Sequence, residues 1–254
     1  MSTVIRTKAL ILRHTDDREH DRQLVVLTPN LGQQQIRARG TKKSISKLGG
    51  SLEPLMEVDM MVANGRVVDV VTGSIIRRRW PRLRSDLIAL VSAQWLFELV
   101  ERVTKPNQPE PGLYPLVVQM LEAMTGEIVW SSGRRWLLLL RRAWQILQHE
   151  GFAPSLERCG FCHRPLSADD LVFQPLHGFV HRAEAQAGYM ALSTDTVDYL
   201  RNEGQPNDQR QIFRQVRQLL RLVIEQTLDR PLQSDQVLQS VMRFERLSGA
   251  AVSG

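Results

Sequence analysis

The chain has 254 residues, a length that can form two domains and bury a substantial hydrophobic core. Met1–Lys8 lacks the apolar segment of a secretory signal, and the charge-free run Leu87–Phe97 is shorter than the roughly 18 residues of a membrane-spanning helix. The two cysteines, Cys159 and Cys162, are not the scattered set of a disulfide-stapled secreted scaffold. We therefore expect a cytoplasmic protein without membrane contact.

The positive charge is unevenly distributed along the chain. The net charge of +6 arises from 33 Lys and Arg against 27 Asp and Glu, and residues 1–79 hold 14 of the former and 8 of the latter. The first third therefore accounts for the whole excess. A basic excess in one domain is typical of a polyanion site, and no basic amphipathic helix accompanies it, which favours nucleic acid over a membrane. The alternative is a merely solvated surface.

The first third predicts a β-domain. Five short runs rich in Val, Ile, Leu and Met are separated by turn residues: Ile5–Arg13, Gln23–Thr28, Gln33–Arg39, Leu55–Ala63 and Arg66–Ile76. Asn64-Gly65 predicts a type I′ hairpin turn with positive φ at both residues, and Thr28–Gly32 predicts a second turn. Five strands in this length favour a closed barrel of the OB type, which leaves no open sheet edge.

After Trp80 the apolar pattern changes to a helical period. Ser85 is a candidate N-cap for a helix that runs to about Val100. Further helices are predicted over Tyr114–Met124, around Trp136–Leu147 with Gly151 behind the C-terminus, and over Gln209–Leu228. The sequence therefore predicts an α+β fold with an OB domain over residues 1–80 and a helical domain over residues 81–254.

One segment concentrates the cations of the first third. Residues 37–47, named the basic segment, hold five cations and no acid: Arg37, Arg39, Lys42, Lys43 and Lys47. Small polar residues and backbone N–H groups lie between them, which suits phosphate contacts that position a nucleic acid without reading its bases. The acids between the first two strands, which include Asp16 and Asp17, are interpreted as a solvated loop. We predict phosphate binding by the basic segment, with a solvated loop as the alternative.

Catalytic sequence patterns are incomplete or missing. The segment from Gly40 to Ser44 resembles the end of a phosphate-binding P-loop, but Gln35 stands where the first glycine belongs and Lys43 is inserted before the serine. Neither a Gly-x-Ser-x-Gly nor a His-Glu-x-x-His pattern occurs. We therefore predict that the protein is not an enzyme.

Cys159 and Cys162 have the spacing of half a structural zinc site, in which two thiolates from one turn take two tetrahedral positions. His181 and Glu184, also three residues apart, are candidate partners, and nearby alternatives are His163 and His177. A Cys2HisGlu set is unusual for a purely structural zinc, and apolar packing offers another way to hold this segment. The sequence therefore favours the metal-free alternative over bound zinc.

The last predicted helix carries a row of arginines. These recur at i, i+4, i+7 and i+11, which aligns them opposite the apolar face: Arg210, Arg214, Arg217 and Arg221. We name this row the arginine stripe. It is suited to binding phosphate or an acidic peptide, and a solvated helix face is the alternative.

Several motifs, in the same order, resemble the bacterial RecO recombination mediator family. They are Ala9–Arg13, Glu19–Arg22, Thr28-Pro29-x-x-Gly32, Ala38–Gly40, Ser46-x-Leu48-Gly49, Leu52-x-Pro54 and Arg230-Pro231-Leu232-x-Ser234. They extend from about residue 5 to 240 and are densest in the N-terminal third. The resemblance implies an OB domain, a helical domain and a zinc-ribbon-like insert, here at about residues 157–190.

The resemblance also implies function. It implies binding of single- and double-stranded DNA, annealing of complementary strands, and action with RecR and the single-strand-binding protein SSB so that RecA can load during gap repair. Association with the nucleoid follows from such a role. Many members have two C-x-x-C pairs, whereas this chain has His181 and Glu184 at the second pair. This departure affects metal binding and leaves the DNA role untouched.

We therefore predict a DNA-binding recombination mediator whose helical domain serves as a platform for partners. The arginine stripe is a candidate site for the acidic, apolar tail of SSB. Two alternatives remain: a protein-binding adaptor without its own DNA site, and a zinc-dependent enzyme that acts on nucleic acid. Salt-sensitive DNA binding without turnover distinguishes the three.

Overall fold

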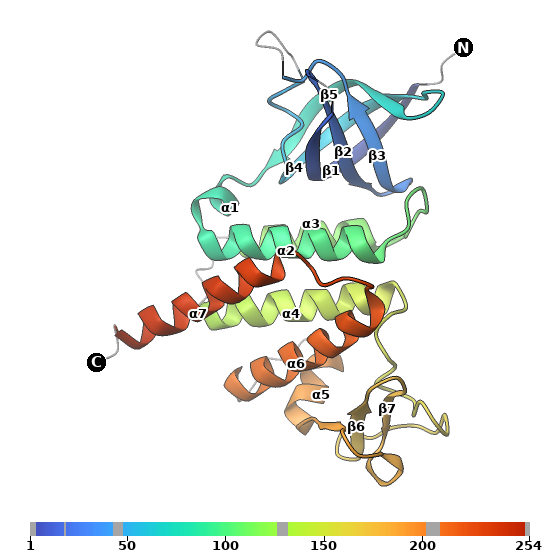
Figure 1. Cartoon of the computed structure of the whole chain (residues 1–254), viewed down its shortest axis with the longest axis vertical. Coiled ribbons are helices and arrows are strands. Elements are labelled where there is room, and N and C mark those ends of the chain that lie inside the picture. The colour runs from blue at the N-terminus through green and yellow to red at the C-terminus, as the bar shows by residue number, and fades with distance from the viewer. Residues whose placement is uncertain (1–3, 18, 43–47, 126–131, 202–208, 252–254) are drawn as a thin grey trace. The chain divides into compact units, whose positions relative to one another are not determined.

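The computed structural model describes residues 4–17, 19–42, 48–125, 132–201 and 209–251 (Figure 1). Contacts group the chain into two units, one of residues 1–128 with 232–254 and one of residues 129–231. The division into domains over residues 1–80 and 81–254 stays a prediction, because a contact unit can hold more than one domain. Among the described residues, none of the helices has the length and apolar character needed to cross a membrane.

Five strands of the first unit form a closed barrel (Figure 1). They are β1 (Val4–Asp17), β2 (Asp21–Thr28), β3 (Gly32–Ala38), β4 (Met56–Ala63) and β5 (Asp69–Arg79). The strands follow the order β1-β2-β3-β5-β4, and β4 returns to β1. All neighbours are antiparallel except β3 and β5. The predicted α+β fold with an N-terminal five-stranded OB-type barrel is confirmed.

Alternating apolar residues fill the barrel. Its core cluster consists of Ala9, Ile11, Leu24, Val26, Ile36, Ala38, Leu52, Met56, Val58, Met60, Val62 and Val71. In β1 to β4 the core residues recur at every second position, because successive side chains of a strand point to opposite faces. The parallel seam joins Ile36 to Asp69 and Arg37 to Val70. Arg37, the first cation of the basic segment, therefore lies at the position where the barrel closes.

The turn between β4 and β5 differs from the prediction. Ala63 pairs with Val70, so the connection is longer than two residues, and neither Asn64 nor Gly65 has a positive φ. The predicted type I′ turn is therefore wrong. The Asp69 side chain closes a wider turn by accepting a hydrogen bond from Gly65 N at 3.0 Å. A Cβ at Gly65 would come within 1.9 Å of Val68 O, so this close approach explains the glycine.

The predicted turn between β2 and β3 is present. Thr28 pairs with Gly32, and the Thr28 hydroxyl accepts from Leu31 N and donates to Gly32 O, both at 3.0 Å. Gly32 has φ +66, and a Cβ there would lie 1.8 Å from Gln108 O. Only glycine fits this position, because both the backbone conformation and the space exclude a side chain.

In the described part of the first unit, the barrel is followed by the helices α1 (Pro81–Ser85), α2 (Leu87–Val103), α3 (Leu113–Thr125) and α7 (Asp235–Ala251). The N-cap of α2 is Asp86, whose side chain accepts from Ala89 N at 3.0 Å. The prediction of Ser85 as this cap is wrong, because Ser85 ends α1. Helix α2 is buried on most of its surface, since it packs against α1, α3, α7 and β1.

A buried carboxylate connects the barrel to α3. Glu57 of β4 is 3% exposed and accepts a hydrogen bond from the Tyr114 hydroxyl at 2.8 Å. Arg78 Nε lies 3.2 Å from Glu57 Oε2, and Arg78 also pairs with Glu122 of α3. Burial and the bond to Glu57 raise the pKa of Tyr114, so the phenol remains a donor at neutral pH. Because an unpaired buried carboxylate is costly, these partners fix α3 against β4.

The second unit combines three helices with a small sheet. The helices are α4 (Ser132–His149), α5 (Thr194–Arg201) and α6 (Gln209–Thr227). The sheet has the order β7-β6-β8 and contains β6 (Leu171–Gln174), β7 (Gly178–His181) and β8 (Met190–Ala191), with a 3-10 turn, η1 (Arg182–Glu184), after β7. Strands of two to four residues are too short to show a recognisable alternation, so the sequence did not predict them.

Glu98 of α2 holds the start of α7. Its carboxylate accepts hydrogen bonds from Gln233 N at 2.7 Å, from Ser234 N at 2.8 Å and from the Ser234 hydroxyl at 2.5 Å. These donors directly precede Asp235, the first residue of the helix, and Leu232 beside them is buried. A carboxylate near a helix N-terminus satisfies free N–H groups and interacts favourably with the helix dipole. The late Leu232-x-Ser234 motif thus has a structural role.

Replacing Glu98 with Ala should lower the free energy of unfolding by about 1–3 kcal/mol, because three donors lose their acceptor. Chemical denaturation followed by tryptophan fluorescence measures this change. Gln94→Ala alters an exposed position on the same helix and should change stability by no more than about 0.5 kcal/mol. Equal stability of the two variants would contradict a capping role for Glu98.

Candidate nucleic-acid interface and metal site

The basic segment leaves the barrel at the end of β3. Arg37 lies within this strand, and Arg39 and Lys42 follow in a turn whose Gly40 has φ +64. Gly40 N donates to Asp21 Oδ1 at 2.9 Å, and Lys42 N donates to the backbone oxygen of His20 at 3.2 Å. The turn is therefore fastened to the β1–β2 connection. The other two predicted cations, Lys43 and Lys47, lie outside the described residues.

Two cations of the basic segment pair with acids of β1. Arg37 Nε lies 2.7 Å from Asp17 Oδ2, and Lys42 Nζ lies 2.9 Å from Asp16 Oδ2. The hydrogen bond from Lys42 lowers the pKa of Asp16. The interpretation of Asp16 and Asp17 as a merely solvated loop is therefore wrong, because β1 continues to Asp17 and brings both carboxylates to the cations. Arg39, by contrast, is exposed.

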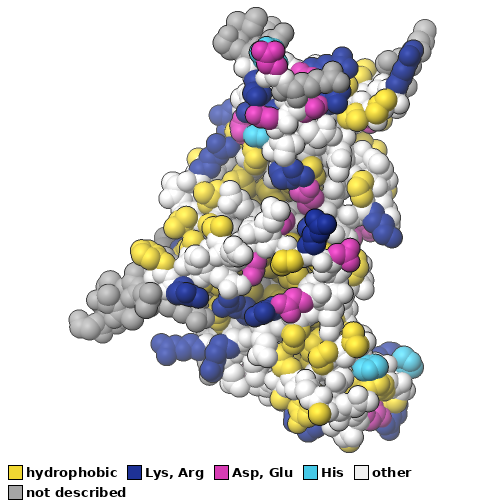
Figure 2. Space-filling view, in the orientation of Figure 1, with side chains coloured by type: hydrophobic (Ala, Val, Ile, Leu, Met, Phe, Trp, Pro, Cys, Tyr) yellow, Lys and Arg dark blue, Asp and Glu magenta, His cyan; other side chains and the backbone are white. Residues whose placement is uncertain are grey.

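A third ion pair lies on the same barrel. Arg22 Nη1 is 2.7 Å from Glu53 Oε1, and His14 Nε2 is 3.1 Å from Glu53 Oε2. Partial burial opposes ionisation of Glu53, but the hydrogen bonds from Arg22 and His14 outweigh it and lower its pKa. Sequence reasoning missed this group because its members are distant along the chain. Acidic and basic side chains accordingly intermingle over the barrel (Figure 2).

Further exposed cations lie on β1 and β5. Arg6 and Lys8 face outward on β1, and Arg77 and Arg79 face outward on β5. Arg77 Nη1 lies 3.5 Å from Asp59 Oδ2 on the strand between them. The sequence could have indicated these exposed cations, because Arg6 and Lys8, like Arg77 and Arg79, are two residues apart and so lie on one face of a strand. The cations of the barrel are therefore more widely spread than the basic segment alone.

The arginine stripe lies along α6. Arg210, Arg214 and Arg221 are exposed, and Arg217 is half-buried. Arg221 Nε forms an i,i+4 ion pair with Glu225 Oε1 at 2.8 Å. The opposite face of α6, which includes Val216 and Leu219, is buried, and α6 packs against α4. The stripe therefore presents cations to solvent, while its binding role stays a prediction.

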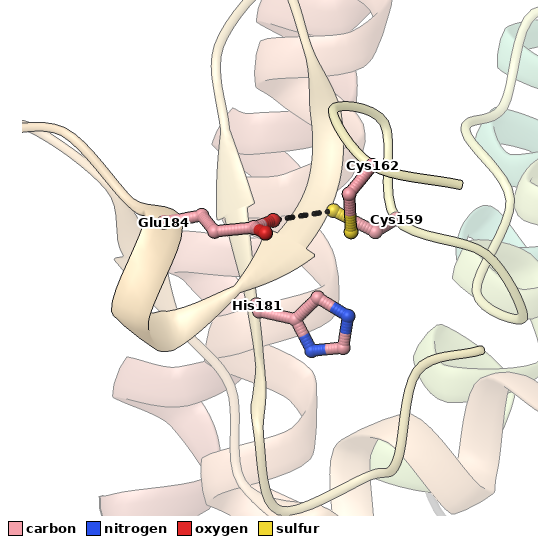
Figure 3. A group of neighbouring side chains, drawn as sticks. All are labelled: Cys159, Cys162, His181 and Glu184. Carbon is pink, nitrogen blue, oxygen red and sulfur yellow. Dashed lines mark hydrogen bonds between the residues drawn. The ribbon is translucent and has the colours of Figure 1, made fainter. Parts of the chain in front are cut away.

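Four side chains of the second unit converge on one point (Figure 3). The potential ligand atoms of Cys159, Cys162, His181 and Glu184 all lie within 4.8 Å of one another. Cys159 Sγ donates to Glu184 Oε2 at 3.0 Å and accepts from Phe161 N at 3.4 Å. His181 ends β7 and Glu184 lies in η1, so the turn after the strand brings both beside the cysteines. In the described part of the chain, the alternatives His163 and His177 are not members of this group.

The surroundings of this cluster suit zinc. His181 Nε2 is buried without a hydrogen-bond partner among the described residues, whereas its Nδ1 lies 2.5 Å from Asp170 Oδ2. A carboxylate on the far nitrogen is the common partner of a metal-bound imidazole. The hydrogen bond from Arg164 lowers the pKa of Cys162, which favours the thiolate form that binds metal. Two sulfurs, one imidazole and one carboxylate are enough donors for a four-coordinate zinc site, so these four residues could hold zinc, and its binding stays a prediction.

The topology of the barrel defines a class of protein. Five-stranded barrels of this kind are OB folds, and the class commonly binds oligonucleotides. Comparison with known proteins identifies the family. Residues 1–79 match the model described as Recombination protein O N terminal, and residues 84–236 match Recombination protein O C terminal. The chain belongs to the RecO family of DNA repair proteins.

Individual relatives agree with the family models. A DNA repair protein RecO of Dehalococcoides mccartyi is 32% identical over 199 residues, which cover 77% of this chain and 76% of the relative. The RecO proteins of a Roseiflexus species and of Geobacter sulfurreducens are each 33% identical, over 69% and 65% of this chain and 60% and 66% of their own lengths. The resemblance predicted from the motifs is confirmed.

Protein purified without chelator should contain about one zinc per chain when metals are measured by mass spectrometry. Asp170→Asn should weaken zinc affinity by about 10- to 100-fold, because His181 loses the carboxylate that orients its ring. Asp169→Asn changes the adjacent exposed acid and should bind zinc as the wild type does. Zinc content far below one per chain in the wild type, with no stabilisation by added zinc, would contradict the site.

Proposed function

We propose that the protein is a recombination mediator that holds DNA on its OB barrel through phosphate contacts of the basic segment. The excess of positive charge in residues 1–79, which equals the net charge of the whole chain, carries this proposal. Phosphate contacts of this kind bind both single and double strands, and they lower the repulsion between two strands that must anneal. Membership of the RecO family supports a role in DNA repair.

The acids beside the basic segment determine how DNA would bind. A phosphate that reaches Lys42 or Arg37 competes with Asp16 or Asp17, which occupy these cations in the free protein. Exposed ion pairs such as Lys42–Asp16 contribute only about 0–1 kcal/mol, so exchange of the Asp16 carboxylate for a phosphate costs little, whereas Arg37 and Asp17 are half-buried. Release of condensed counterions from DNA then supplies the gain in free energy, and binding should fall steeply with salt.

The metal cluster supports a mediator without catalytic activity. Catalytic zinc sites in proteins keep one coordination position open for water or substrate, whereas structural sites are closed by four protein ligands. Here Cys159, Cys162, His181 and Glu184 supply four donors, which is the closed arrangement. The sequence also lacks an intact P-loop. These observations favour a structural role for zinc over the zinc-dependent enzyme considered from the sequence.

The helical residues are proposed as the platform for protein partners. SSB, RecR and RecA are the partners that the family resemblance implies, and binding to SSB-coated DNA is how the protein would help RecA to load. The arginine stripe on α6 offers exposed guanidinium groups to an acidic tail such as that of SSB. A protein that handles chromosomal DNA in this way would work in the cytoplasm at the nucleoid.

The variant Arg39→Ala, Lys42→Ala, Lys43→Ala should bind oligonucleotides more weakly and with a shallower salt dependence. Each lost phosphate contact should reduce the slope of log affinity against log salt by about 0.7 for single strands and about 0.9 for duplex. Fluorescence anisotropy over a range of salt concentrations measures both. Annealing of complementary strands should slow in parallel and be indifferent to ATP.

Asp16→Asn is a matched variant with the opposite expected effect on DNA affinity. It removes the carboxylate that competes with phosphate for Lys42 and leaves the cation in place. It should bind DNA more tightly than the wild type. A folded triple variant with unchanged affinity and salt slope would falsify the placement of the site. Weaker binding by Asp16→Asn would contradict the competition between carboxylate and phosphate.

The partner proposal predicts that Arg214→Glu with Arg217→Glu weakens binding of an acidic, apolar tail peptide from SSB by at least about tenfold, because two attractions become repulsions. Titration calorimetry with the peptide measures the change. Arg230→Glu, an exposed arginine beyond the helix, serves as the control. Unchanged affinity in the double variant would exclude the stripe as the tail site.

A further inference from the structure

The turn that carries the two cysteines also presents an aromatic ring at the surface. Phe161 is 36% exposed, and its ring centroid lies 4.3 Å from that of His177, with 36° between the two planes. His177 is exposed in the turn between β6 and β7. Histidine and hydrophobic side chains adjoin on the surface of the second unit (Figure 2). Phe161 and His177, named the ring pair, belong neither to the four candidate zinc ligands nor to the buried core.

The backbone holds the ring pair in position. Gly160 N donates to Phe179 O at 2.8 Å, and His177 N donates to Gln174 O at 3.2 Å. A Cβ at Gly160 would lie 1.8 Å from His177 O, so only glycine lets the two turns approach this closely. The bond from Phe161 N to Cys159 Sγ ties the ring pair to the zinc cluster. A surface ordered in advance in this way loses little conformational freedom when it binds a ligand.

Cations accompany the ring pair. Arg158 and Arg164 are exposed on the same turn, and Arg158 Nη1 donates to the backbone oxygen of His163 at 3.3 Å. The Arg164 side chain is 70% exposed although it pairs with Glu184. The neighbouring acid Glu157 is engaged by Arg201 at 3.1 Å. Guanidinium groups beside aromatic rings match the phosphates and bases of a nucleic-acid strand.

The side chains at this surface favour a nucleic-acid base over a peptide. A helical or extended peptide needs an apolar groove for its side chains. Leu176, the exposed apolar residue next to His177, is 86% exposed and projects from the turn. A base needs only a ring face and a nearby cation, since every base has a π face that can stack.

We infer that the ring pair binds an unpaired nucleic-acid base by stacking, with Arg158 and Arg164 near the flanking phosphates. The inference rests on the proposed function for the class of ligand, but its residues belong to the second unit and share none with the basic segment. Because paired bases offer no free face, this site adds a preference for single strands to the sequence-independent affinity of the barrel.

A single-stranded oligonucleotide with one fluorescent aminopurine base tests the inference, because stacking on an aromatic ring quenches this base. The zinc-containing full chain should bind the strand and quench it. Phe161→Ala should weaken single-strand binding by about 5- to 150-fold, the range for loss of one base–aromatic stack, and should remove the quenching. Duplex binding should be unchanged. Phe161→Trp retains a ring and should retain both signals.

Leu176→Ala is the matched control, because it removes an exposed apolar side chain next to His177 without removing a ring. It should bind and quench as the wild type does. Residual quenching in the basic-segment variant would support a second site. Equal affinity and quenching in Phe161→Ala and the wild type, at equal zinc content, would overturn the inference and leave the barrel site standing.

Two other results would also overturn it. If Phe161→Ala and Leu176→Ala both lost RecR binding while single-strand binding stayed normal, the surface would be a protein-docking site. If the wild-type protein bound neither strand nor duplex, the proposed function itself would fail, and this inference would fail with it.

Discussion

Closure of the barrel depends on a short parallel pairing between β3 and β5. Ile36 pairs with Asp69 and Arg37 with Val70, whereas the other neighbouring strands form longer antiparallel pairs. Because side chains alternate along a strand, this register places Ile36 in the core and Arg37 outside it. A shift by one residue would reverse both positions, burying a cation and exposing an apolar side chain. The location of the basic segment is therefore a consequence of how the barrel closes.

In both candidate sites, neighbouring side chains hold the proposed binding groups in place. On the barrel, Asp16 and Asp17 pair with Lys42 and Arg37. In the second unit, the hydrogen bond from Phe161 N to Cys159 Sγ connects the turn on which Phe161 lies to the four candidate zinc ligands. Both candidate sites thus hold their proposed binding groups in fixed positions, which lowers the conformational entropy that a ligand would cost on binding.

The sequence predicted long elements well and tertiary details poorly. Strands β1 to β5 each have at least seven residues, so their apolar runs and the turn residues between them located them. The turn type at Asn64-Gly65 was wrong, because the Asp69 side chain, outside the dipeptide, decides the geometry. Spacing nominated the four zinc-ligand candidates, but the Asp170 partner of His181 depends on the fold and was missed. The pairing of Asp16 with Lys42 was missed for the same reason.

Hydrogen exchange of the full chain, with and without a single-stranded oligonucleotide, tests most directly whether the barrel holds DNA through the basic segment. We expect slower exchange of backbone amides in peptides that contain residues 37–42, because Gly40 N and Lys42 N are hydrogen-bonded to the β1–β2 connection. Added protection at residues 158–164 is compatible with this result. Slower exchange confined to the second unit, with residues 37–42 unchanged at saturating oligonucleotide, would contradict it.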